Sequence, residues 1–197
     1  IMETHESGII PDPALIAHGS TLERAVEEQA RRLDVAEIQN LMDAVVREAV
    51  ALATAKIGAS STTIWVVAPN RDSLLVAHSW PAEELLGFQQ PIDEGFVSLV
   101  LGSEQAICEN RVYEHAAHSK RVDRELAKVT CSMIAAPFYV GGLMRGVFSC
   151  VKWKDSLETE DPPEFTASDL NRVKLLSAAV ERLLNYRIMV DLLGLQL

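Results

Sequence analysis

The sequence predicts an α+β domain, with a central antiparallel sheet of about five or six strands, helices packed on one face and long helices at both ends. Two observations carry this prediction. Short β-branched and apolar segments occur in pairs, and the later pair is joined by Gly141-Gly142, a strong signal for a two-residue hairpin. Before the first pair and after the second, apolar residues recur at the three- and four-residue spacing of amphipathic helices.

Composition limits the classes of protein to which the chain can belong. Its 197 residues, 48% hydrophobic and 23% charged, suit one folded domain with extensions and exclude a disordered chain. A net charge of -10 argues against a nucleic-acid partner. We expect no membrane span, because no apolar run approaches the ~20 residues that cross a bilayer. The sparse cysteines fit free thiols in a reducing compartment, so we expect a cytoplasmic protein.

The amino-terminal part divides into an arm and two helices. Residues 1–20 carry prolines and glycines without periodicity, which predicts a flexible arm. Residues 21–33 have helical spacing and form the expected N-terminal helix. Asp34, with Glu37 three residues later, has the pattern of a helix cap, and Gly58 is suited to end the helix that follows.

The remaining domain is expected to span residues 34–190, including a terminal helix. Residues 191–197 form the end of that helix and should lead into an output domain of a longer protein. The expected strands are Ser61–Ala68, Ser73–Trp80, Ser132–Val140 and Leu143–Lys154. The segment between the two pairs is mixed, and its expected elements are a helix at 95–101, a strand at 106–108 and a charged helix at 122–129.

Four short motifs occur in order along this domain. Ile92–Val97 is a glycine turn before an apolar helix, and Ser132–Pro137 has the spacing S-x-x-x-x-P within a strand. Gly141–Val147 is the hairpin with a Gly-Val pair, and Phe165–Leu170 has the form F-T-x-x-D before an apolar residue. Together these motifs resemble a GAF domain. The resemblance implies a GAF/PAS-like two-layer fold and a sensory or regulatory role in a signalling protein.

The long segment between the paired strands points to a ligand site. Residues 87–130 provide enough chain to lift off the sheet and roof a cavity, and such pockets are mostly apolar with a few polar groups. We therefore expect a small-molecule ligand beneath this roof. The candidate ligand-binding residues lie on or beside it: Phe96, Cys108, His115, His118, Arg121 and Met133.

A basic cluster within the roof has two interpretations. Lys120, Arg124 and Lys128 are four residues apart and would share one helix face, which in an acidic chain points to an anionic ligand or partner. The alternative, which we favour, is a solvated helix face on which Arg121 pairs with Glu125.

No cofactor is clearly indicated. The GAF resemblance associates cyclic-nucleotide binding with an Asn-Lys pair followed by Phe-x-x-x-Asp-Glu. This chain keeps Lys154, Phe165 and Asp169 but has Trp153 and Leu170 at the other two positions, so the motif is incomplete and a cyclic nucleotide stays possible.

Other cofactors of the family have less support. A bilin would need a cysteine in the helix before the Ser132 strand, and residues 109–130 contain no cysteine. Haem would need a histidine in the loop just before that strand, and residues 125–130 contain no histidine. His115 and His118 have a chelating spacing, but no further ligands lie nearby, so no metal is expected.

The flanking helices predict a homodimer. The terminal helix carries two apolar stripes, whereas packing on one sheet face needs only one. The first helix or a second copy should cover the other stripe. The expected interface residues are Leu22, Val26, Val180, Leu183, Arg187 and Val190. The alternative is a terminal helix that packs only on its own domain.

These observations predict a non-catalytic sensory module, because no Ser-His-Asp arrangement, paired carboxylates or phosphate-binding glycine loop has usable spacing. The first alternative is a ligand-free dimerisation or protein-interaction module. A more distant one is an enzyme like the free methionine-R-sulfoxide reductase, which also resembles this fold. In this chain, one of that enzyme's cysteines would fall at Val97. The enzyme's nucleophilic cysteine would lie before the Ser132 strand, and this chain has no cysteine at that position.

Overall fold

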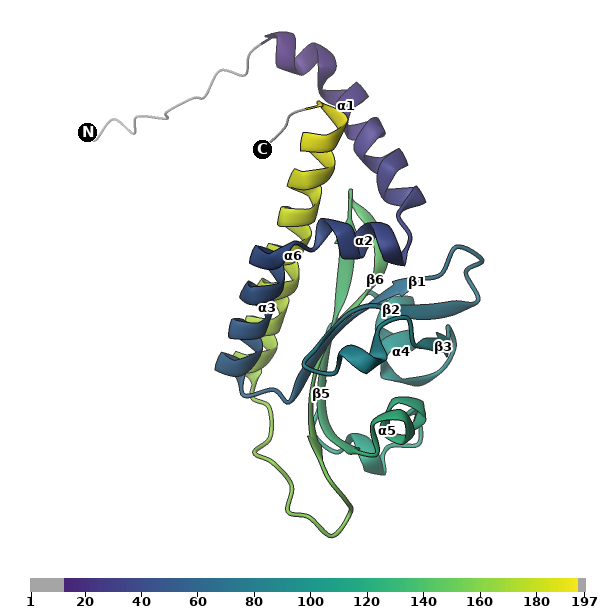
Figure 1. Cartoon of the computed structure of the whole chain (residues 1–197), viewed down its shortest axis with the longest axis vertical. Coiled ribbons are helices and arrows are strands. Elements are labelled where there is room, and N and C mark those ends of the chain that lie inside the picture. The colour runs from purple at the N-terminus through teal and green to yellow at the C-terminus, as the bar shows by residue number, and fades with distance from the viewer. Residues whose placement is uncertain (1–12, 195–197) are drawn as a thin grey trace, which may run out of the picture.

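The structure is a computed structural model that describes residues 13–194. A six-stranded antiparallel sheet with the order β3-β2-β1-β6-β5-β4 lies at its centre (Figure 1). The predicted α+β fold with an antiparallel sheet is therefore confirmed. The strands are β1 (Ser61–Val67), β2 (Ser73–Trp80), β3 (Gln89–Pro91), β4 (Ile107–Glu109), β5 (Val129–Val140) and β6 (Leu143–Lys154).

The long helices and the short helix α2 (Val35–Leu41) gather on one face of this sheet, and other short helices cover the opposite face (Figure 1). The long-helix side was predicted; the short-helix side is built from the mixed segment in the middle of the chain. The helices are α1 (Pro13–Arg32), α2 (Val35–Leu41), α3 (Ala44–Ile57), α4 (Gly95–Ser103), α5 (Arg121–Leu126) and α6 (Ala167–Leu192), with the 3-10 turns η1 (Glu83–Leu85) and η2 (Val112–Glu114).

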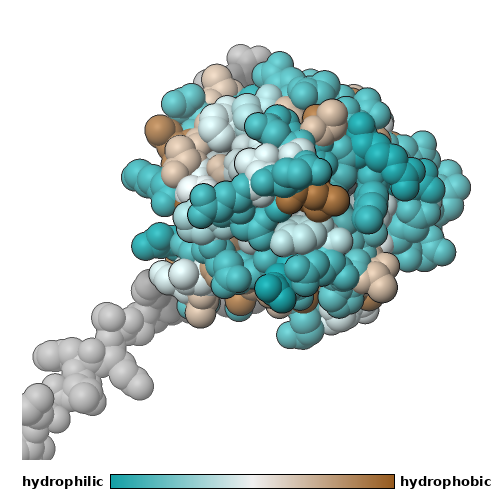
Figure 2. Space-filling view, turned by 90° about the horizontal axis from the view of Figure 1, so that it is seen from below, coloured by the Kyte–Doolittle hydropathy of each residue, from teal (hydrophilic) through white to brown (hydrophobic). Residues whose placement is uncertain are grey.

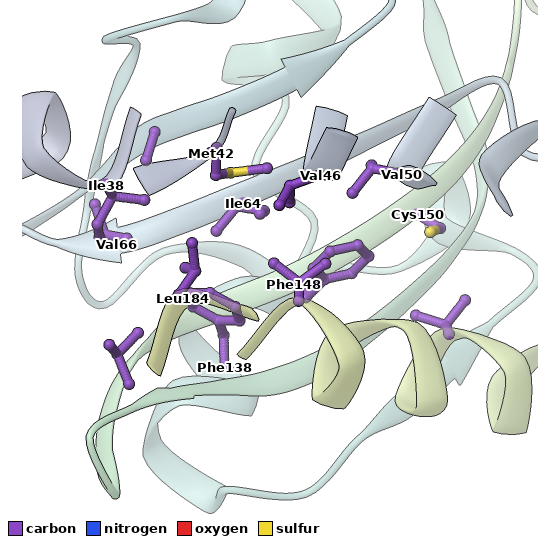
Figure 3. Packing of buried hydrophobic residues seen from close by; sticks show 14 of the residues in the cluster. Ile38, Met42, Val46, Val50, Ile64, Val66, Phe138, Phe148, Cys150 and Leu184 are labelled. Carbon is purple, nitrogen blue, oxygen red and sulfur yellow. The ribbon is translucent and has the colours of Figure 1, made fainter. Parts of the chain in front are cut away.

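The larger core lies between the sheet and the long helices. Figure 3 shows side chains of α3 (Val46, Val50), of the strands (Phe138, Phe148) and of α6 (Leu184) packed together. Each buried phenylalanine stabilises the fold by roughly 1.5–3 kcal/mol relative to an exposed one. This core fixes the sheet between its two helical layers.

The predicted hairpin joins β5 to β6. Gly141 and Gly142 have φ angles of 57° and 78°, in the left-handed region that glycine adopts without strain. Further along β6, Gly146 lies against β1 so closely that a Cβ would be 1.7 Å from the carbonyl oxygen of Trp65. Only glycine allows the two strands to approach in this way.

The first helix begins earlier than predicted. It starts at Pro13 rather than at residue 21, because proline suits the first turn of a helix, where its missing N–H has no intrahelical partner. Gly19 within it costs about 1 kcal/mol relative to alanine, which a helix of this length tolerates. The rest of the predicted arm, residues 1–12, lies outside the described residues, as do residues 195–197 at the other end.

The helix predicted from Asp34 to Gly58 is two helices. Asp43 accepts a hydrogen bond from the N–H of Val46 at 2.9 Å and so begins α3. The Arg47 guanidinium binds two carbonyl groups at the end of α2, that of Met42 at 2.6 Å and that of Gln39 at 3.0 Å. The predicted cap at Asp34 is present as a complete capping box with Glu37. None of the helices within residues 13–194 is long and apolar enough to cross a membrane.

Candidate ligand-binding site

A cavity of about 50 Å³ lies between the sheet and the short helices. A buried water needs roughly 10–15 Å³, so the cavity has room for a few water molecules. The sheet is its floor. Alternate residues of a strand share one face, and the floor consists of such residues: Ser61, Thr63 and Trp65 of β1, Ser149, Val151 and Trp153 of β6, and Met133 of β5.

The roof comes mostly from residues 87–130. Gly95 begins α4 with a φ of +77°, and a Cβ there would lie 3.1 Å from the Cβ of Ser119. Glycine thus lets the two roof segments touch. The outer surface of the end of the molecule that carries α5 is hydrophilic over most of its area (Figure 2). The roof residues that line the cavity are Leu85, Gln90, Gly95, Phe96, Val97, His118, Ser119, Val122, Asp123, Leu126, Lys128 and Thr130.

A bidentate ion pair, here called the roof ion pair, joins Glu94 to Arg121. Arg121 Nε donates to Glu94 Oε2 at 2.7 Å, and Nη2 donates to Oε1 at 2.9 Å. These hydrogen bonds hold the pKa of Glu94 below its ordinary value. Because Glu94 precedes α4 and Arg121 begins α5, the pair ties the two roof helices together at the outer surface.

Asp123 is the polar centre of the inner roof. Its carboxylate accepts hydrogen bonds from His118 Nε2 at 2.8 Å and from Thr130 Oγ1 at 2.6 Å. Burial raises the pKa of Asp123, but the hydrogen bonds from His118 and Thr130 outweigh burial and leave the pKa below its ordinary value. Asp123 is therefore negatively charged at neutral pH, and it is one of the residues that line the cavity.

The structure brings three of the six candidate ligand-binding residues to the cavity. Phe96, His118 and Met133 line it. His115 does not line it: the side chain is exposed, and its ring contacts that of Phe96 with 5.0 Å between centroids. His115 therefore supports the roof from outside.

The other two candidates lie elsewhere. Arg121 is on the rim, where it pairs with Glu94 rather than with Glu125 as one interpretation proposed. Cys108 is on the opposite side of the sheet, because it lies across from Ile134 in the strand register and so packs against the larger core. Neither side chain lines the cavity.

Sequence reasoning missed the polar floor. The alternation Ser61-x-Thr63-x-Trp65 places two hydroxyls and an indole on one face of β1, and this period of two was present in the sequence. Ser149 of β6 could not be found in that way, because only the strand register places it beside Thr63.

The three thiols lie outside the cavity lining. Burial raises the pKa of all three, that of Cys131 to about 11 and that of Cys150 to about 12. Reactive thiols need a lowered pKa, so these cysteines are predominantly protonated at neutral pH. Within residues 13–194, no three His, Cys, Asp or Glu side chains are grouped to hold a metal ion.

The residues shared with cyclic-nucleotide-binding members make structural contacts. Lys154 Nζ donates to Asp161 Oδ1 at 2.5 Å, and Asp169 forms a capping box with Thr166 at the start of α6. The ring of Phe165 packs in the larger core. None of them lines the cavity.

Most of the expected interface residues are used within the chain. Val180 and Val190 are 2% and 8% exposed, so they are core residues, and Val26 packs against the same core. Arg187 pairs with Asp43. Leu22 is half-buried, whereas Leu183 is exposed. The exposed apolar residues of α6 and its end, here called the α6 stripe, are Leu175, Leu183, Tyr186, Met189, Leu192 and Leu193.

Helix α6 also binds the outer edge of β5. Strand β4 covers β5 only up to Ala135, and beyond it three α6 side chains take its place. Ser177 donates to the carbonyl of Pro137 at 3.2 Å, Glu181 accepts from the N–H of Tyr139 at 3.0 Å, and Asn185 accepts from the N–H of Gly141 at 2.8 Å. Four helical residues rise about 6 Å and two strand residues about 6.6 Å, so the spacings match. We call these three bonds the α6–β5 ladder.

The antiparallel sheet, the long helices on one face and the roofed cavity on the other give the chain a GAF-like fold. The GAF domain of a phosphoenolpyruvate-protein phosphotransferase from Coxiella burnetii is 14% identical and superposes with a TM-score of 0.58, covering 90% of this chain and 97% of that chain. The GAF domain of the phosphoenolpyruvate-protein phosphotransferase from Acinetobacter is 16% identical and superposes with a TM-score of 0.57, covering 86% of this chain and 93% of that chain.

An enzyme also has this fold. The free methionine-R-sulfoxide reductase from Neisseria meningitidis, solved with its substrate, is 16% identical, with a TM-score of 0.52 over 98% of this chain and 100% of that chain. At such identities the likeness shows the fold alone. No protein-family model matches the sequence, and a search of curated proteins finds no match.

Proposed function

We propose that this chain is a non-catalytic, cytoplasmic sensory or regulatory module that binds a small molecule in the roofed cavity and signals through α6 as a homodimer. The observation that carries the proposal is the position of the cavity. A surface ion pair, Glu94–Arg121, joins two segments of its roof, and its floor includes β5, the strand bonded to α6.

The α6–β5 ladder supports a route from the cavity to the helix. Met133 of β5 lines the cavity, and Pro137 and Tyr139 of the same strand are bonded to α6. A ligand that displaces β5 would change the geometry of this ladder. It can shift the helix only by its difference in affinity for the two arrangements.

The α6 stripe supports association of two copies. Apolar residues such as Leu175 and Tyr186 are 71% and 53% exposed along one helix. A second α6 would remove this apolar area from water. In a longer signalling protein, the paired helices would then carry the change to an attached output domain.

Thermal-shift measurements with cyclic nucleotides, amino acids, 2-oxo acids and purines test ligand binding. A binder should raise the unfolding temperature with concentration and slow amide exchange in residues 115–128 and in α6. If no compound raises that temperature or changes exchange in the roof, the sensory proposal is wrong. Light scattering tests the dimer, which Leu183→Glu should dissociate while Leu157→Glu, in the loop after β6, should not.

The small cavity favours one alternative, a ligand-free dimerisation module. Side chains such as Trp65, Phe96 and Trp153 leave only about 50 Å³ between them. This alternative predicts a dimer that depends on Leu183. It also predicts that no compound alters amide exchange in the roof. A reductase-like activity has less support, because raised thiol pKa values disfavour thiolate chemistry.

A further inference from the structure

Four hydroxyl side chains lie on the cavity face of the sheet. Ser79 of β2, Thr63 of β1 and Ser149 of β6 are opposite one another in the strand register, so their side chains are on the same face. Ser61 is two residues from Thr63 on the same strand and shares this face. A buried row of hydroxyls beneath Trp65 departs from the apolar packing expected of a core.

Two of these hydroxyls have no hydrogen-bond partner. Ser149 Oγ accepts from Trp65 Nε1 at 3.3 Å and donates to the carbonyl of Thr63 at 3.4 Å. Ser61 Oγ and Ser79 Oγ are buried, in residues only 1% and 3% exposed, and find no partner among the side chains and backbone of residues 13–194. A buried hydroxyl without a partner destabilises a fold, so most are satisfied. Ser61 lines the cavity, where a bound molecule would supply the missing partner.

The charges around the cavity disfavour an anion. Asp123 lines the cavity with a negatively charged carboxylate that is bonded to His118 and Thr130. Within the part of the chain described by the structure, the basic residues of the lining are Lys128 and His118, and each is bonded to a carboxylate. Lys128 Nζ is bonded to Asp155 Oδ1 at 2.5 Å, and His118 Nε2 to Asp123 Oδ2 at 2.8 Å. Arg121 is outside and bonded to Glu94. A ligand carboxylate or phosphate would be buried next to a carboxylate without an unpaired counterion, which is costly.

We infer that the ligand of this cavity, which must enlarge by movement of the roof to admit it, is a small uncharged molecule with an apolar, ring-like body that packs against Trp65, Phe96 and Trp153 and one polar edge that bonds to Ser61. The inference rests on the proposed function and specifies its ligand class. It sets aside the cyclic nucleotides and 2-oxo acids, which are anions at neutral pH.

The first test needs no ligand. If the Ser61 hydroxyl is unsatisfied, Ser61→Ala should leave the unfolding temperature of the free chain unchanged or raise it. Ser168→Ala, at an exposed position in the first turn of α6, is the control. A lower unfolding temperature for Ser61→Ala, with no change for Ser168→Ala, would show that this hydroxyl already has a partner in the free chain, from the protein or from water in the cavity, and the inference would be overturned.

The second test uses matched probes, nicotinamide with nicotinate and benzamide with benzoate. Each pair shares a ring, and only one member carries a charge. Binding is followed by thermal shift and by tryptophan fluorescence, since Trp65 and Trp153 line the cavity. The amides should bind at least about tenfold more tightly than the carboxylates. Ser61→Ala should weaken amide binding about three- to tenfold, and Ser168→Ala should not.

The outcomes separate this inference from the proposed function. Equal or tighter binding of the carboxylates, with slower exchange in residues 115–128, would leave the sensory module standing and overturn the uncharged ligand. Amide binding that Ser61→Ala does not weaken would also overturn it, as would the failure of both amides to bind. The broader compound panel then decides the sensory function independently.

Discussion

Glu181 of α6 and Tyr139 of β5 are joined by a hydrogen bond from the Tyr139 N–H to Glu181 Oε1 at 3.0 Å. This bond lies at the centre of the α6–β5 ladder, on an edge of β5 that no strand within residues 13–194 covers. An uncovered edge exposes backbone groups that can pair with another chain. Glu181 is half-buried, and burial raises the pKa of its carboxyl group.

Substitution of Glu181 tests this ladder. Glu181→Ala leaves the Tyr139 N–H without its acceptor and should lower the free energy of unfolding by about 1–3 kcal/mol. Glu181→Gln keeps an acceptor oxygen without a buried charge, so at pH 7 it should be at least as stable as the wild type. Urea denaturation measures the free energy of unfolding of both variants and of the wild type. Equal stability of all three proteins would show that the ladder contributes nothing.

The pH dependence of Glu181 has a definite sign. Because the folded-state pKa lies above the ordinary 4.5, the wild type gains stability from this group below that pH and loses it as the pH rises through the folded-state value. The stability of Glu181→Gln relative to wild type should therefore increase between acidic and neutral pH. A constant difference would mean that the carboxyl group titrates normally.

Loss of the roof ion pair should loosen the roof without unfolding the domain. Arg121→Gln removes both hydrogen bonds to Glu94, and amide exchange in residues 115–126 should become faster. The pair is partly exposed, so the unfolding temperature should change little. Arg124→Gln, on the same helix, is the control because Arg124 makes no side-chain ion pair in the described structure. Unchanged exchange in Arg121→Gln would mean that apolar packing alone closes the roof.

Asp123 should stabilise the inner roof at neutral pH. Asp123→Asn replaces the ionic acceptor of His118 and Thr130 and should lower the free energy of unfolding by about 1.5–3 kcal/mol at pH 7. The pKa of Asp123 is below the ordinary 3.8, so this stability exists above that pH and is lost as the pH falls through the lower folded-state value. The difference from wild type should shrink towards pH 3. Glu125→Gln, exposed on the same helix, should show neither effect.

The thiols should react slowly in the folded protein. The pKa of Cys131 and of Cys150 is raised to about 11 and about 12 by burial, so little thiolate exists at pH 8. With Ellman's reagent, Cys108, which is less buried, should react first, and the other two should react fully only in denaturant. Rapid reaction of Cys131 or Cys150 in the native protein would point to a reactive thiol and would strengthen the reductase-like alternative.

Two glycines should respond in opposite ways to alanine. Gly146→Ala would place a Cβ 1.7 Å from the Trp65 carbonyl oxygen, so the strands must separate and the variant should be severely destabilised or insoluble. Gly102→Ala, in α4, meets nothing within 4 Å and should stabilise the protein by about 0.5–1 kcal/mol. Thermal unfolding compares them, and a stable Gly146→Ala would show that β1 and β6 can move apart.

Much of the fold was determined by local sequence. The capping box at Asp34, the Gly141-Gly142 turn and the two-residue periodicity of the strands each depend on neighbours along the chain, so the sequence was sufficient to predict them. The split at Asp43 was also local, because aspartate caps the helix beginning at Ala44, but a continuous apolar pattern obscured it.

The site depended on tertiary structure. The roof was predicted as a segment, and Phe96, His118 and Met133 do line the cavity. The sequence could not show that Cys108 lies on the opposite face of the sheet, since the pairing of β4 with β5 decides it. Nor could it show which partner Arg121 selects, since Glu94 is distant along the chain.

The terminal helix gives the same lesson. Its sequence showed two apolar stripes, one with Val180 and Leu183 and the other with Leu175 and Leu184, but not which members of each the domain buries. Val180 and Leu184 lie in the core, whereas Leu183 and Leu175 are exposed. Periodicity fixes which residues share a face, because that depends only on helix geometry. Packing between distant segments fixes what each face meets, and only the folded chain brings those segments together.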